Sequence, residues 1–114
     1  MAKITPAVLR SRSIRELILK IGYNTHQAAP GVAVLARHVY AAFSTGRVQY
    51  EKAEIDVEIS DLIDDGLLAV EDLPGVGVGP AEKGYQATSK GRDFYRAGYP
   101  WGRIDEFTGD GQIA

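Results

Sequence analysis

Hydrophobic residues recur at helical spacing along the first part of the chain. Pro6 and the capping-box pattern of residues 13–16 each mark a helix start, because both suit the first turn of a helix. The helix that follows is predicted to end at Gly22. Its apolar positions form a single stripe: Ile14, Leu17, Ile18 and Ile21.

Two further helices are predicted before residue 66. Residues 23–29 show no periodicity and are predicted to connect to a second helix that begins at Pro30 and closes at residues 44–46. Its apolar stripe is Val32, Leu35, Ala36, Val39 and Phe43. Val48 and Tyr50 are expected in a very short strand. The third helix then runs to Gly66, with these residues facing inward: Ile55, Ile59, Leu62 and Ile63.

Beyond Gly66 the pattern is typical of a β-hairpin followed by one more helix. Two short strands, 67–70 and 85–88, flank a segment rich in glycine and proline. Ser89 is expected to cap a short helix over residues 90–97. The predicted fold is therefore α+β and mainly helical, with one domain over residues 1–98 and an irregular tail over residues 99–114.

Composition narrows the class of protein. With 114 residues, 45% of them hydrophobic, the chain can bury one core without a covalent staple. It has no cysteine, which excludes disulfides and thiolate chemistry. Its apolar stretches are shorter than the roughly 20 residues of a membrane span, and the start lacks a signal-peptide pattern. We expect no membrane partner, and cytoplasm is the default location.

Charge is divided unevenly between the two halves of the chain. Residues 1–50 carry seven bases and one acid, a net charge of +6, whereas residues 51–114 carry six bases and fourteen acids, a net charge of −8. This division indicates an anionic partner for the first half, association between copies, or ion pairing inside one domain.

Two local strings resemble winged helix-turn-helix regulators of the MarR and PadR kind. The string 65–68 (DGLL) is similar to the exit of their third helix, and the string 85–92 (YQATSKGR) is similar to the end of their wing. The resemblance covers about residues 47–98 and implies a fold of three helices, a two-stranded wing hairpin and a short C-terminal helix. It also implies DNA binding through the third helix and wing, and frequent dimerisation.

The third helix departs from that pattern because acids follow one another along it at steps of three and four residues. These acids are Glu51, Glu54, Glu58, Asp61 and Asp65. We call them the acidic stripe, and we expect it on the face away from the core. Three interpretations are open: a solvated face, a surface that pairs with a second copy or a basic protein partner, or an imitation of nucleic acid. Docking this face against a polyanion is electrostatically unfavourable.

Contacts to double-stranded DNA are therefore expected from basic residues elsewhere on the chain. The candidates come from the first half, the turn before the third helix and the wing region: Arg12, Arg15, Arg37, Arg47, Lys83, Lys90 and Arg92. Each can also be an ordinary surface residue. Trp101 and Phe107 are candidates for a dimer or partner interface, since aromatic residues bury a large area at low entropic cost.

Catalytic, metal and cofactor sites are not predicted. The glycine-rich segment 75–80 lacks the Lys-Ser or Lys-Thr and the helix of a phosphate-binding loop. His26 and His38 have no zinc-ligand pattern around them. The predicted function is a small DNA-binding transcriptional regulator that contacts phosphates through its basic first half and wing. The alternative is a non-catalytic interaction module, or a DNA-mimicking inhibitor, that uses the acidic stripe against a basic partner.

Overall fold

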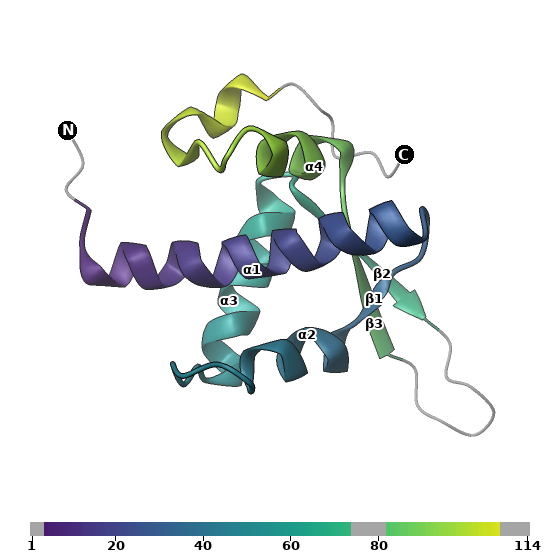
Figure 1. The fold of residues 1–114 in the computed structure, drawn as a ribbon, viewed down its shortest axis with the longest axis horizontal. Coiled ribbons are helices and arrows are strands. Elements are labelled where there is room, and N and C mark those ends of the chain that lie inside the picture. The colour runs from purple at the N-terminus through teal and green to yellow at the C-terminus, as the bar shows by residue number, and fades with distance from the viewer. Residues whose placement is uncertain (1–3, 74–81, 108–114) are drawn as a thin grey trace.

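A long first helix crosses the molecule, and the other elements pack around it (Figure 1). The computed structural model describes residues 4–73 and 82–107. The elements in chain order are α1 (Pro6–Ala28), β1 (Val34–Leu35), α2 (Ala36–Phe43), α3 (Lys52–Asp64), β2 (Leu68–Leu73), β3 (Glu82–Ala87), α4 (Ser89–Arg96) and the 3-10 helix η1 (Trp101–Glu106). The fold is thus mainly helical with one small sheet, as the sequence predicts.

Helix α1 begins where predicted and ends later than predicted. The Thr5 side chain accepts a hydrogen bond from the Val8 amide (3.2 Å), and Pro6 occupies the first turn. The predicted stop at Gly22 is wrong, because the helix continues to Ala28. Gly22 is buried against β3: a Cβ at this position would lie 3.0 Å from the Ala87 Cβ. Its glycine therefore allows close packing of α1 on the sheet.

The region between α1 and α3 corrects two further expectations. Pro30 does not begin a helix; residues 34–35 form strand β1, and α2 starts only at Ala36. The strand expected at Val48 and Tyr50 is absent, and the Tyr50 ring instead packs edge-on against Phe43 at 5.4 Å. Strand β1 pairs with β3, so it depends on residues about 50 positions further along the chain.

Helix α3 and the hairpin follow the predicted order. Ile55, Ile59 and Leu62 are buried, and Gly66 closes the helix with a φ of +77°, a conformation that favours glycine. Strands β2 and β3 pair antiparallel with Leu68 opposite Ala87, and the sheet order is β1-β3-β2. The strands extend further toward the hairpin end than predicted, and the predicted loop at 74–81 lies outside the described residues.

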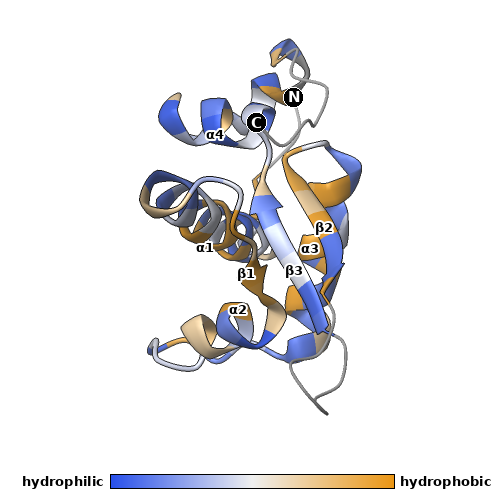
Figure 2. Cartoon of the chain, turned by 90° about the vertical axis from the view of Figure 1, so that its right-hand side faces the viewer, coloured by the Kyte–Doolittle hydropathy of each residue, from blue (hydrophilic) through white to orange (hydrophobic). Residues whose placement is uncertain are grey.

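Helix α4 and η1 cover the opposite end of the sheet. The cap of α4 is Thr88 rather than the predicted Ser89: its hydroxyl accepts from the Gly91 amide (3.0 Å). Residues 101–106, expected to be irregular, form η1 against this helix. Hydrophobic segments of α1, α3, β1 and β2 surround one central core (Figure 2). The completely buried side chains Leu62, Leu67 and Phe94 lie in this core.

Candidate nucleic-acid interface

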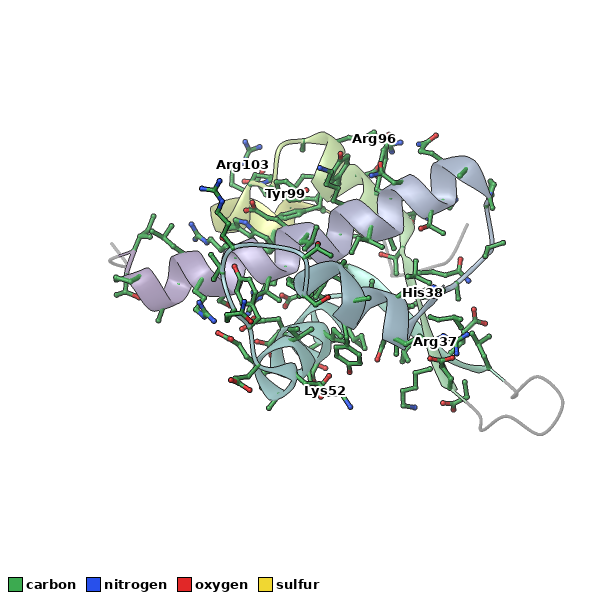
Figure 3. The ribbon with its side chains drawn as sticks, turned by 60° about the horizontal axis from the view of Figure 1, so that its bottom comes forward. Arg37, His38, Lys52, Arg96, Tyr99 and Arg103 are labelled. Atoms are coloured by element: carbon green, nitrogen blue, oxygen red, sulfur yellow. The ribbon has the colours of Figure 1, made fainter. Side chains whose placement is uncertain are left out.

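Helices α2 and α3 and the β2–β3 hairpin define one side of the molecule. Arg37 and His38 on α2 and Lys52 on α3 lie on the side from which the hairpin emerges (Figure 3). Arg96, Tyr99 and Arg103 lie across α1 on the other side (Figure 3). We call the first side the α2–α3 face. In a helix-turn-helix protein this is the side that approaches DNA.

The acidic stripe does not lie on the outer face of α3, so that prediction is wrong. Its central members pack against α1. Glu58, only 8% exposed, accepts hydrogen bonds from Arg15 Nε (2.8 Å) and from the Ser11 hydroxyl (2.6 Å). Asp61 accepts from Arg15 Nη2 (2.9 Å), and Glu54 forms a two-point ion pair with Arg10. The opposite charges of the two halves of the chain thus meet at the α1–α3 contact.

The two outer members of the stripe occupy the ends of α3. Glu51 is the N-cap residue, and its amide donates to the Glu54 carboxylate (3.4 Å). Asp65 is the C-cap residue, and its carbonyl oxygen accepts from Lys90 Nζ (2.9 Å). The hydrogen bond from Arg10 holds the pKa of Glu54 below its ordinary value of 4.5. The stripe is therefore largely a structural contact within the chain.

Sequence reasoning could have placed Glu58 correctly. It follows Ile55 by three residues and precedes Leu62 by four, so it shares the buried face of the helix. The partner on α1 gave no such signal, because Arg15 is 43 residues away. The exposed face of α3 consists instead of Lys52, Ala53, Asp56, Val57, Ser60 and Asp64.

One of these exposed acids is held by α2. The Tyr40 hydroxyl donates to Asp56 Oδ1, and Lys52 Nζ lies 5.0 Å from the centre of the Tyr40 ring. Burial and the neighbouring Asp56 raise the pKa of Tyr40, so the hydroxyl keeps its proton for this hydrogen bond. A hollow of about 380 Å³ beside the pair separates α3 from the hairpin and is lined also by Ser60 and Lys83.

Three of the predicted DNA-contacting residues are exposed on or near the α2–α3 face. The Arg37 side chain is 70% exposed and only loosely paired with Glu82 (3.8 Å). Lys83 is exposed on β3 and pairs with Asp72 across the hairpin (2.8 Å). Arg47 is exposed in the connection between α2 and α3. Sequence reasoning missed Lys52, which begins α3 on the same side.

The other four predicted contacts lie elsewhere. Arg15 is engaged with α3, and the buried Arg92 donates to the Ala87 carbonyl oxygen (2.8 Å). Lys90 donates to the C-terminal end of α3. Arg12 lines a second hollow, of about 420 Å³, between α1 and η1. The structure therefore does not bring these four residues together with Arg37, Arg47 and Lys83.

Trp101 and Phe107 pack within their own chain. Their rings lie 4.7 Å and 5.4 Å from that of Phe94, both edge-on. Trp101 Nε1 also donates to the Glu16 carboxylate (2.8 Å). These contacts fix the segment after α4 to α1, and no second copy is needed to explain the position of either ring.

The described part of the chain holds neither a metal-ligand cluster nor a membrane span. No three histidine, aspartate or glutamate side chains are grouped as metal ligands in residues 4–73 and 82–107. None of the helices in these two ranges combines the length and apolar character required to cross a bilayer.

Comparison with known proteins gives a match at the level of fold. No family model and no curated protein matches the sequence. The structure is similar to the X-ray structure of a PadR-like transcription factor from Bacteroides fragilis, with a TM-score of 0.63. The match covers 88% of this chain and 90% of that chain, at 19% sequence identity. The predicted winged helix-turn-helix fold is confirmed.

Proposed function

We propose that this protein is a DNA-binding transcriptional regulator that uses its α2–α3 face. The observation that supports this most strongly is the position of the acidic stripe: Arg10 and Arg15 on α1 pair with it, away from the outer face of α3. The electrostatic objection to docking α3 in a major groove is thereby reduced to two exposed acids of this helix, Asp56 and Asp64. The PadR-like structure is a transcription factor, and its fold supports the same class of function.

In the proposed complex, α3 enters the major groove and exposed cations flank it. Backbone phosphates are contacted by four exposed cations: Arg37, Lys52 and Lys83, which line one hollow, and Arg47 in the connection between α2 and α3. This arrangement differs from the sequence prediction, in which the first half and the wing bound DNA without the outer face of α3. The alternative of an acidic interaction surface loses support, since Glu54, Glu58 and Asp61 already have partners inside the chain.

We also propose that two copies bind one DNA site, as the resemblance to dimeric regulators implies. Helix-turn-helix dimers read two half-sites about one helical turn apart. Light scattering of the free protein and of its DNA complex measures the number of copies. One copy in both states would contradict the dimer and leave the proposed DNA contacts unaffected.

Binding to labelled duplex DNA tests the proposed function directly. Fluorescence anisotropy with a mixed-sequence duplex at low salt should show binding that weakens steeply as salt is added. The variant Arg37→Ala/Lys52→Ala should bind at least about tenfold more weakly at physiological salt, because two phosphate contacts are lost.

A matched control removes the same charge from the other side of the molecule. Arg96 and Arg103 are exposed there, and each pairs with a nearby surface acid. The variant Arg96→Ala/Arg103→Ala should bind like the unmodified protein. Equal weakening by both double variants would indicate nonspecific attraction, and no binding at low salt would contradict the proposed function.

A further inference from the structure

The centre of the exposed face of α3 is small and uncharged. Ala53, Val57 and Ser60 follow one another at steps of four and three residues, so they form one line on the helix surface. Val57, in the middle, is the hydrophobic side chain of this line and is 57% exposed. We call these three residues the neutral line.

The charges around the neutral line favour a nucleic acid over an apolar protein as its partner. Lys52 precedes the line on α3, and Arg37 lies on the same side of the molecule. Lys83 lines the hollow between α3 and the hairpin together with Ser60. A small uncharged centre with these cations around it, and with Asp56 held by the Tyr40 hydroxyl, matches a groove floor between two phosphate backbones better than it matches a hydrophobic protein surface.

Lys52, at the start of α3, is the one side chain of this helix that belongs to the types that read purines with paired hydrogen bonds. The helix contains no arginine, asparagine or glutamine, and Lys52 is its one basic residue. Paired hydrogen bonds to guanine come from arginine or lysine, and those to adenine come from asparagine or glutamine. Asp56, beside the line, has one carboxylate oxygen bonded to Tyr40. Asp64 lies near the C-terminal end of α3, beyond the first turns with which recognition helices usually reach base edges.

The apolar group that the major groove offers to a valine is the C5-methyl group of thymine. We infer that Val57 contacts a thymine methyl group, so that this protein selects a T·A base pair by apolar contact. The inference rests on the proposed function. It assigns sequence selectivity to a single exposed side chain on α3, whereas the surrounding cations supply affinity without selectivity.

Removing the methyl group from the DNA tests this assignment with no other change in base pairing. A preferred duplex is first selected from a random library, and a second duplex is made in which deoxyuridine replaces every thymine. The unmodified protein should bind the deoxyuridine duplex about fourfold more weakly for each methyl group it contacts, the effect of burying one such group.

Two variants assign the effect to a residue. Val57→Ala should bind both duplexes equally, because its side chain no longer reaches the methyl group. Val32→Ala is the matched control: Val32 is 54% exposed and lies before β1, outside α3. This control should keep the full preference for thymine. Circular dichroism checks that both variants are folded, which their exposure leads us to expect.

The outcomes separate this inference from the proposed function. Binding to the selected duplex with equal affinity for thymine and deoxyuridine would overturn the methyl contact and leave DNA binding intact. A preference for thymine that persists in Val57→Ala would overturn the assignment to Val57. Failure of the unmodified protein to bind any duplex would overturn the proposed function, and the methyl contact with it.

Discussion

Arg15 links α1 to α3 through two acids. Its guanidinium bonds the buried Glu58 and the half-exposed Asp61. Removing one partner of a buried ion pair leaves the other charge unpaired, which costs more than the pair itself contributes. We expect Arg15→Ala to lower the free energy of unfolding by about 3 kcal/mol, measured by urea denaturation. Arg103→Ala, which breaks an exposed pair with Glu106, should leave the urea midpoint unchanged.

A second variant distinguishes an unpaired charge from lost packing. Arg15→Met/Glu58→Leu removes both charges and keeps apolar volume at the α1–α3 contact, so it should recover much of the stability that Arg15→Ala loses. If the double variant is as unstable as Arg15→Ala, the loss comes from packing or from Asp61, and not from an unpaired Glu58.

The ionisation of Glu54 makes the stability of the fold depend on pH in the acid range. Its hydrogen bond with Arg10 lowers the pKa of the folded-state carboxyl below 4.5. A lowered pKa contributes stability above the ordinary value, and this contribution is lost as the pH falls below 4.5 and through the folded-state pKa. Melting temperatures of Glu54→Gln should therefore fall less steeply than those of the unmodified protein between about pH 5 and pH 3.

At the scale of elements, Gly91 determines how closely α4 approaches the end of α3. A Cβ at this position would lie 2.0 Å from the Leu67 carbonyl oxygen, so α4 would have to move. We expect Gly91→Ala to lower the free energy of unfolding by about 2–3 kcal/mol, measured by thermal or urea denaturation. Gly46→Ala is the control, because nothing lies within 4 Å of the Cβ it adds. Equal stability of the two variants would contradict the close approach.

An element could be predicted from the sequence where its own segment carries the apolar pattern and the residues that end it. Helix α3 and the hairpin follow from patterns within each segment, and Thr88 with Gly91 belongs to the string that resembles a wing end. The later end of α1 and strand β1 could not be predicted in this way. Gly22 lies inside the helix, where Ala87 packs on it, and β1 exists because Val34 and Leu35 pair with β3.

The candidate site is less predictable than the fold, for a physical reason. A periodic acidic stripe is compatible with a solvent face or with a contact between helices, and single-sequence periodicity does not separate the two. Partners on α1 decide the question: Arg10 and Arg15 lie more than 40 residues before the acids they bind. Because those pairs hold the acidic stripe against α1, the outer face of α3, which includes Val57, is a surface separate from the stripe.

At the scale of the whole molecule, the number of exposed cations on one side sets the salt dependence of binding. Four of them surround the α2–α3 face: Arg37, Arg47, Lys52 and Lys83. Each phosphate contact contributes about −0.9 to the slope of log K against log salt, so one bound copy should give a slope of about −4 and two copies about −7. Anisotropy titrations at several salt concentrations measure this. A slope near zero would contradict phosphate contacts altogether.

Trp101, bonded to Glu16 and packed on Phe94, is the single tryptophan of the chain. Its indole emission therefore reports on the attachment of the segment after α4 to α1. The emission should shift to longer wavelength when that segment detaches and water reaches the ring. Since the ring belongs to η1, on the side of the molecule opposite the α2–α3 face, DNA titration should leave its spectrum unchanged. Trp101 emission can therefore follow the detachment of this end of the molecule separately from DNA binding at the α2–α3 face.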